Sequence, residues 1–157
     1  MALAIRSGIG SCAWCFGDYR LFGRGVALFP GGLGYFFTMF SEAVLEHFRN
    51  PRNSGVLPNA DMSAEVANPV CGDVLQLSIR IESGRIVEAR FLCRGCTTAI
   101  ACASYLTVEL TNRTLAEARD ITPESLSAAL DGLPAATFHG AQLAVDALHA
   151  ILARASS

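Results

Sequence analysis

The chain has 157 residues, of which 52% are hydrophobic and 17% charged, and its formal net charge is −2. This length and apolar content suit one domain with a well-buried core and leave no room for two full domains. The slightly negative charge argues against binding of nucleic acid or of an anionic membrane surface. The chain contains no lysine, which excludes lysine-based catalysis.

Six cysteines are present. They would suit three disulfides, but a chain with so much apolar sequence can build a core without such cross-links. Their uneven spacing fits reduced thiols better, and we therefore expect a cytoplasmic protein.

Residues 1–38 differ from the rest of the chain. They hold eight of the 14 glycines, and their apolar stretches (residues 26–29 and 35–37) are far shorter than the roughly 20 residues that span a bilayer. Cys12 and Cys15 have the spacing of a thioredoxin-type dithiol, but the flanking strand and helix that such a motif needs are missing. We expect a poorly structured extension, or translated upstream sequence with the true start at Met39, followed by one domain over residues 39–157.

The predicted elements begin directly after this methionine. Residues 40–48 have an amphipathic helical pattern, and Ser41 can cap the start of the helix. A short strand is predicted at residues 64–67. Apolar and polar residues then alternate over residues 75–81 and again over residues 87–91, which predicts two half-buried strands around a turn at Ser83-Gly84.

Helices dominate the second half. One is predicted after Cys96, with Ala99, Ala103, Leu106 and Leu110 buried. Two shorter helices follow at residues 114–119 and 123–130, the latter with Thr122 as its cap. The last helix, residues 139–153, carries one apolar stripe. The predicted fold class is α+β, a small antiparallel three-stranded sheet with helices packed on one face.

The junction between the second strand of the hairpin and the following helix is a candidate functional site because it carries thiols. Cys96 precedes the first turn of a helix, whose unpaired N–H groups favour the thiolate, the form that binds metals. Cys93 and Cys96 form a C-x-x-C pair, which fits half a zinc site, a redox dithiol, or two cysteines of which only one matters. Two further features favour the interpretation as a metal site: Cys71-Gly72-Asp73 before the hairpin, and His139 at the start of the last helix.

The motifs together resemble the iron–sulfur scaffold family, the IscU/SufU-type proteins and the N-terminal domain of NifU. The matching segments are residues 46–55 (EHFRNPRNSG), residues 68–73 (NPVCGD), Gly95-Cys96 followed by residues 99–101 (AIA), Leu133-Pro134, and His139.

This resemblance implies an IscU/NifU-like fold and a non-enzymatic function. Proteins of that family build a nascent [2Fe–2S] cluster with sulfur from a cysteine desulfurase and pass it to apo-protein acceptors, and the resemblance implies the same partners and cargo here. The implied ligands are Cys71, Asp73, Cys96 and His139, with iron or zinc as other occupants of the same site. A monomer or weak dimer is expected.

The chain departs from the family pattern in two places. A third cysteine is expected directly after the histidine, where this sequence has Gly140, and the segment after Leu133-Pro134 lacks the lysine associated with chaperone recognition. Cys93 is a possible substitute ligand. We expect Gly140→Cys to cost the fold little and to lengthen the lifetime of a cluster. Cys102 is expected in the core, and His47 and His149 at the surface.

Each site residue also has a structural interpretation. The two thiols can be buried core residues, Asp73 a turn residue, and His139 a capping or solvent-facing residue. At the level of function, the alternatives are a degenerate scaffold homologue acting as a partner-binding or sulfur-accepting accessory, a Cys93/Cys96 dithiol oxidoreductase, and a zinc hydrolase. The two enzymatic alternatives are the weakest, and for a zinc hydrolase the sequence offers no general base beyond the four ligands.

Overall fold

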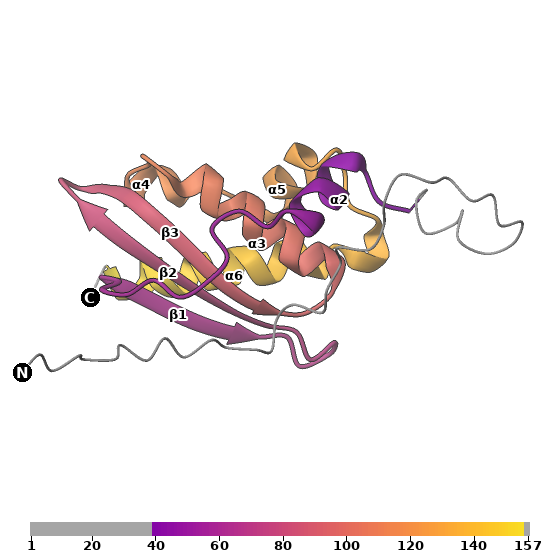
Figure 1. Cartoon of the computed structure of the whole chain (residues 1–157), viewed down its shortest axis with the longest axis horizontal. Coiled ribbons are helices and arrows are strands. Elements are labelled where there is room, and N and C mark those ends of the chain that lie inside the picture. Colours follow the sequence, from indigo (N-terminus) through magenta and orange to yellow (C-terminus); the bar gives the residue numbers. More distant parts are fainter. Residues whose placement is uncertain (1–38, 156–157) are drawn as a thin grey trace, which may run out of the picture. The chain divides into compact units, whose positions relative to one another are not determined.

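The computed structural model describes residues 39–155, so the predictions for residues 1–38, including the Cys12/Cys15 pair, lie outside the described part. Within the described part, helix α2 comes first, the strands of the sheet follow it, and the remaining helices come last (Figure 1). Their bounds are α2 (Glu42–Arg49), β1 (Met62–Ala67), β2 (Val74–Glu82), β3 (Arg85–Arg94), α3 (Thr97–Leu110), α4 (Leu115–Ala118), α5 (Pro123–Ala129), a 3-10 turn at Ala135–Thr137, and α6 (His139–Ala155).

The strands form one antiparallel sheet in the order β1-β2-β3, which confirms the predicted sheet. Ser83 and Gly84 both have positive φ, 51° and 78°, the backbone form that matches a tight hairpin to the twist of its strands. Apolar residues pair directly across β2 and β3, for example Leu77 with Phe91. Because side chains alternate between the faces of a strand, this register gives the sheet one apolar face.

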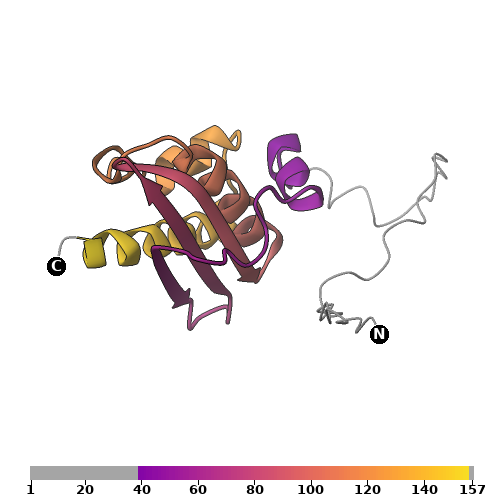
Figure 2. The same ribbon diagram turned by 60° about the vertical axis from the view of Figure 1, so that its left-hand side comes forward.

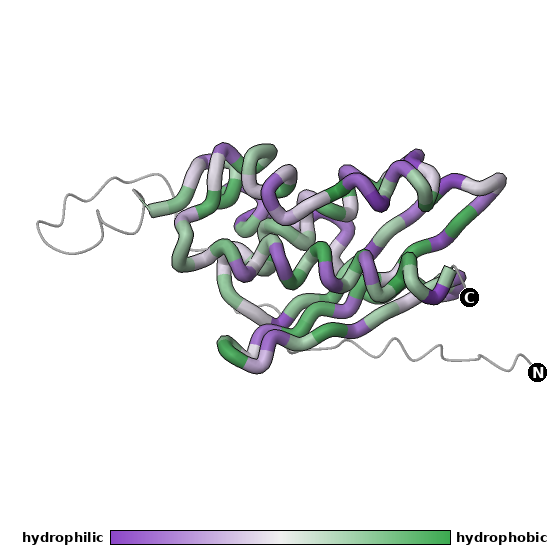
Figure 3. The backbone as a smooth tube through the Cα atoms, turned by 180° about the vertical axis from the view of Figure 1, so that it is seen from behind, coloured by the Kyte–Doolittle hydropathy of each residue, from purple (hydrophilic) through white to green (hydrophobic). Residues whose placement is uncertain are grey.

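Helices α3 and α6 cover that face, α3 against β3 and α6 against β1 and β2 (Figure 2). Apolar and polar residues are interspersed along the helices and strands (Figure 3). All four residues expected to be buried in α3 are buried, and Cys102 is fully buried, as predicted. The α6 stripe is likewise buried: Leu143, Ala144, Ala147, Leu148, Ile151 and Leu152.

Helix α2 and the loop after it attach to α3 through polar groups. His47, which was expected at the surface, is half-buried: its Nδ1 lies 2.9 Å from Ser104 Oγ, and its ring packs edge-on against Tyr105. Burial, followed by the nearby Arg52 guanidinium, lowers the pKa of His47. The Arg52 N–H also donates to Ser104 Oγ (2.8 Å). His149, in contrast, is exposed as expected.

The predicted helix starts are confirmed by their caps. Ser41 Oγ accepts the Val44 N–H at α2, and Thr114 and Thr122 form capping boxes at α4 and α5. The 3-10 turn at Ala135–Thr137 was not predicted, since three residues are too few for a periodic pattern. Among residues 39–155, no helix combines the length and apolar character needed to cross a membrane.

Candidate metal-binding site

The loop between β1 and β2 carries the first two predicted ligands. The Gly72 N–H donates to the Asn68 carbonyl (2.8 Å), and the Asn68 N–H donates to the Asp73 carbonyl (2.8 Å), so the loop closes on itself. Gly72 has a φ of 74°, a conformation that favours glycine. The loop leaves Cys71 exposed while Asp73 is buried, with 6% of its surface accessible.

The third predicted ligand lies where β3 passes into α3. Cys96 is the N-cap residue of α3, and its side chain makes no capping hydrogen bond to the backbone of the helix. Gly95, just before it, lets Asp73 approach closely: a Cβ at position 95 would lie 2.9 Å from Asp73 Cγ. Glycine is therefore required here for the Cys71–Asp73 loop to lie against the start of α3.

The fourth predicted ligand, His139, is the first residue of α6. Its Nε2 lies 3.7 Å from Cys96 Sγ and 3.9 Å from Asp73 Oδ2. Helix α6 packs against α3, which brings this histidine to the same end of the helix layer as Cys96. The histidine thus stands between the thiol of one segment and the carboxylate of another.

The predicted residues come together at one place. Cys71, Asp73 and His139 each offer a ligand atom, and these three atoms all lie within 4.8 Å of one another. Cys96 is not part of that set of three, but it reaches the set through its contact with His139. Residues up to 68 positions apart in the chain therefore converge, as the sequence predicted.

The carboxylate of Asp73 indicates what kind of ligand this group of side chains can bind. Its Oδ2 is buried and has no hydrogen-bond partner within the described chain. A buried carboxylate oxygen without a partner is costly, and a bound cation would offset that cost. Thiolate, imidazole and carboxylate are ligands of zinc and iron, and the N-terminal ends of α3 and α6 both favour negative charge at this point. The arrangement suits a metal ion or a small anionic cluster.

The family assignment follows from comparison with known proteins. A family model described as the NifU-like N terminal domain matches residues 39–155. The chain belongs to this NifU-like family.

Several curated relatives of this NifU-like chain are named as iron–sulfur cluster assembly scaffold proteins. It is 42% identical over 110 residues to the "Iron-sulfur cluster assembly scaffold protein IscU 1" of Archaeoglobus fulgidus, covering 70% of this chain and 72% of that one. It is 39% identical over 118 residues to the "Iron-sulfur cluster assembly scaffold protein IscU" of Escherichia coli, covering 73% and 91%. In fold it is similar to a putative scaffold protein for the SUF system from Fervidobacterium islandicum, with a TM-score of 0.61, 18% identity, and coverage of 73% and 97%.

Gly140 corrects one expectation drawn from this family. A Cβ at this position would lie 2.8 Å from Ala99 N, 2.8 Å from Thr98 C and 2.9 Å from Thr98 Oγ1. Two of these atoms belong to the backbone of α3 and cannot move aside as a side-chain end could. The expectation that Gly140→Cys costs the NifU-like fold little is therefore wrong, because glycine at this position lets α6 pack closely on α3.

Cys93 is not part of the set of three formed by Cys71, Asp73 and His139. It lies opposite Leu75 in the β2–β3 register and packs against the core. Burial, together with the negative charge of Asp73, raises the pKa of Cys93 to about 12. A thiol of this kind is a poor nucleophile at neutral pH, which weighs against a Cys93/Cys96 dithiol oxidoreductase. A role for Cys93 as a substitute ligand stays a prediction.

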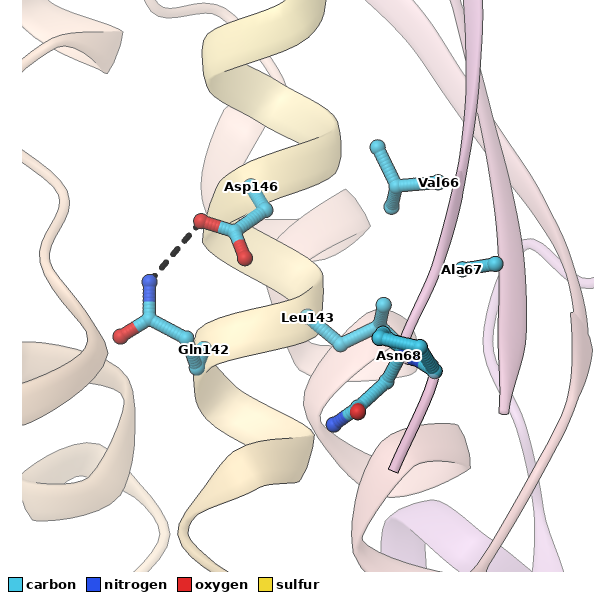
Figure 4. Close-up of a pocket in the computed structure, with 7 residues that line it drawn as sticks. Val66, Ala67, Asn68, Gln142, Leu143 and Asp146 are labelled. Carbon is cyan, nitrogen blue, oxygen red and sulfur yellow. Dashed lines mark hydrogen bonds between the residues drawn. The ribbon is translucent and has the colours of Figure 1, made fainter. Parts of the chain in front are cut away.

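A separate groove runs beside the site between β1 and α6 (Figure 4), with a volume of about 400 Å³. In Figure 4, Gln142 and Asp146 project from α6 and are joined by a hydrogen bond of 2.9 Å. The groove contains no thiol and no histidine; it is lined by Val66, Ala67, Asn68, Pro69, Gln142, Leu143 and Asp146. Its side chains offer no set of metal ligands.

Proposed function

We propose that this chain is a scaffold that assembles a transient iron–sulfur cluster and passes it to apo-proteins. The proposed ligands are Cys71, Asp73, Cys96 and His139, and the proposed cargo is a [2Fe–2S] cluster. The observation that carries the proposal is the convergence of a thiol, a carboxylate and an imidazole within 4.8 Å, with a second thiol 3.7 Å from that imidazole. The curated relatives are named as cluster assembly scaffolds, which supports the same function.

The ligand chemistry explains why the cluster would be transient. Iron–sulfur clusters are held most firmly by four thiolates, and here only two of the four proposed ligands are thiols. Carboxylate and imidazole are harder ligands than thiolate and bind iron–sulfur cores less strongly. One thiol, Cys71, is exposed, so an acceptor protein could exchange its own thiolate for it. A scaffold needs this property, since it has to release what it builds.

Zinc is the second proposed occupant of the site. Two thiolates, one imidazole and one carboxylate make four ligands, which is the number that a closed tetrahedral zinc site uses. Such a site has no open position for substrate, so zinc would not make this chain a hydrolase. Zinc and the cluster would compete for the same side chains.

The partners proposed are a cysteine desulfurase as the sulfur source and apo-proteins as acceptors. The test is anaerobic assembly with ferrous iron, cysteine, a cysteine desulfurase and dithiothreitol, which reduces the persulfide sulfur to sulfide. It is followed by visible absorption and by transfer to an apo-ferredoxin. We expect the absorption of a [2Fe–2S] cluster to develop on the chain and then to move to the acceptor. Cys71→Ala and Cys96→Ala should each lose it.

A matched control separates ligand loss from loss of the fold. Cys102 is a buried thiol of the same helix that follows Cys96, and Cys102→Ala should still assemble a cluster. If the wild-type chain folds but assembles no cluster under these conditions, the scaffold proposal fails. In that case persulfide transfer from the desulfurase to Cys71 or Cys96 would identify the chain as a sulfur-accepting accessory.

A further inference from the structure

Thr98 stands directly beside the proposed ligand Cys96 and is fully buried. Its Oγ1 lies 3.1 Å from Cys96 Sγ and donates to the Thr137 carbonyl at 3.3 Å. The hydroxyl therefore links a site thiol to the turn that immediately precedes His139. No sequence motif pointed to this residue, because the contact with Thr137 spans 39 positions.

Counting protons shows that these two bonds cannot both survive when Cys96 binds a metal. In the thiol form, the Cys96 S–H can donate to Thr98 Oγ1 while the Thr98 O–H donates to the Thr137 carbonyl. A metal-bound Cys96 is a thiolate without a proton, and Thr98 then has one hydrogen for two acceptors. A hydrogen bond to a charged acceptor is roughly twice as strong as one to a neutral acceptor. The hydroxyl should therefore donate to the sulfur.

We propose that Thr98 is a positioning residue for the metal-bound form of Cys96, a proposal that rests on the metal-binding function proposed above. Its hydroxyl donates a hydrogen bond to the ligating sulfur and holds that sulfur toward His139. Hydrogen bonds to ligand sulfurs are among the features that set the reduction potentials of iron–sulfur clusters. Thr98 thus sets the orientation of the Cys96 sulfur and lowers the electron density that this sulfur donates to the metal.

The close packing at Gly140 supports this assignment. The Cβ that Gly140 lacks would fall 2.9 Å from Thr98 Oγ1, so the hydroxyl fills the space beside the α6 start. A threonine hydroxyl at this place cannot rotate into open space, because Thr98 has no exposed surface. The donor is therefore held beside Cys96 by the contact between α3 and α6.

The test uses Co²⁺ as the probe, because thiolate-to-cobalt charge transfer reports on the electrons of the ligand sulfur. Removing a hydrogen bond raises the energy of the sulfur electrons, so the band should move to longer wavelength. We expect this shift in Thr98→Val and in Thr98→Ala, and we expect Thr98→Ser to keep the wild-type band. Thr97→Val, on the same helical turn, is the matched control and should also keep it. Circular dichroism shows which variants fold, and Thr98→Ala adds no bulk to the core.

The outcomes separate the two proposals. If Thr98→Val or Thr98→Ala folds and its charge-transfer band stays at the wild-type wavelength, the assignment of Thr98 is overturned while the metal-binding proposal stands. A shifted band in Thr98→Ser overturns it as well, because serine retains the donor. A wild-type protein with no thiolate-to-cobalt band overturns the metal-binding proposal and this inference together. As a second readout, a reconstituted cluster in Thr98→Val should have a more negative reduction potential than in the wild type.

Discussion

Adding one methyl group at Gly140 should measurably destabilise the protein. Gly140 is buried near the start of α6, and the added Cβ of Gly140→Ala would lie 2.8 Å from two backbone atoms of α3 and 2.9 Å from Thr98 Oγ1. These distances are well below ordinary van der Waals contact. Helix α6 would have to move away from α3, and the apolar contacts between the two helices would loosen.

The size of the effect follows from two opposing terms. Overpacking a well-packed site costs roughly 1–3 kcal/mol. Alanine is favoured over glycine in a helix interior by about 1 kcal/mol, but less of this applies at the second residue of a helix. We expect a net loss of about 1–2 kcal/mol for Gly140→Ala and a larger loss for Gly140→Cys, whose sulfur needs more space. Each kcal/mol corresponds to roughly 4 °C in melting temperature for a domain of this size.

Urea unfolding of the wild type and the two variants measures these differences. Gln142→Ala, an exposed change on the first turns of the same helix, is the control and should stay within about 0.5 kcal/mol of the wild type. Combining Gly140→Ala with Thr98→Ala should recover only part of the loss, because two of the three close atoms belong to the backbone. If Gly140→Ala is as stable as the wild type, α6 does not pack on α3 as described.

Three further predictions concern the surroundings of the site. Gly95→Ala should weaken Co²⁺ binding, because the new methyl group would lie 2.9 Å from Asp73 Cγ and displace that side chain. The circular dichroism spectrum should stay unchanged. An unaltered Co²⁺ affinity would contradict the close approach of Asp73 to Gly95. The pKa of His47 is lowered below 6.5 in the folded protein, so the unfolded chain binds the proton first, and stability should fall as the pH drops through 6.5 toward the folded pKa. His47→Gln should remove that part of the pH dependence in urea unfolding, and an identical pH profile would refute it. With its pKa raised to about 12, Cys93 should react with iodoacetamide at pH 8 far more slowly than the exposed Cys71, as peptide mass spectrometry would show; equal rates would contradict its burial.

Much of the fold could be predicted because its signals are local. Strand β2 alternates apolar and polar residues since one face of the sheet is buried, and Thr122-Pro123 marks a helix start by its own chemistry. Strand β1 begins two residues earlier than the prediction of residues 64–67. Its first residues, Met62 and Ser63, pair with β2, and Ser63 Oγ lies 3.0 Å from Ser78 Oγ. A polar pair of this kind leaves no hydrophobic pattern in the sequence.

The site shows where sequence patterns stop being informative. Cys71, Asp73, Cys96 and His139 could be proposed as ligands because each occurs in a recognisable local motif. The space around Gly140 was misjudged, because it depends on how closely α6 approaches the backbone of α3. Thr98 was missed for the same reason, and so was the contact between His47 and Ser104, which spans 57 positions. Distances between elements are set by tertiary packing, and spacing along the chain carries little information about them.

The central claim is that the four converging side chains hold an iron–sulfur cargo. Its most direct test is the iron, zinc and acid-labile sulfide content of protein purified anaerobically from cells, in parallel with Cys96→Ala. We predict iron and labile sulfide in equal amounts in the wild type, with both lost in the variant. A wild-type protein that contains no iron or sulfide, or whose iron and sulfide are unaffected by Cys96→Ala, would contradict the claim.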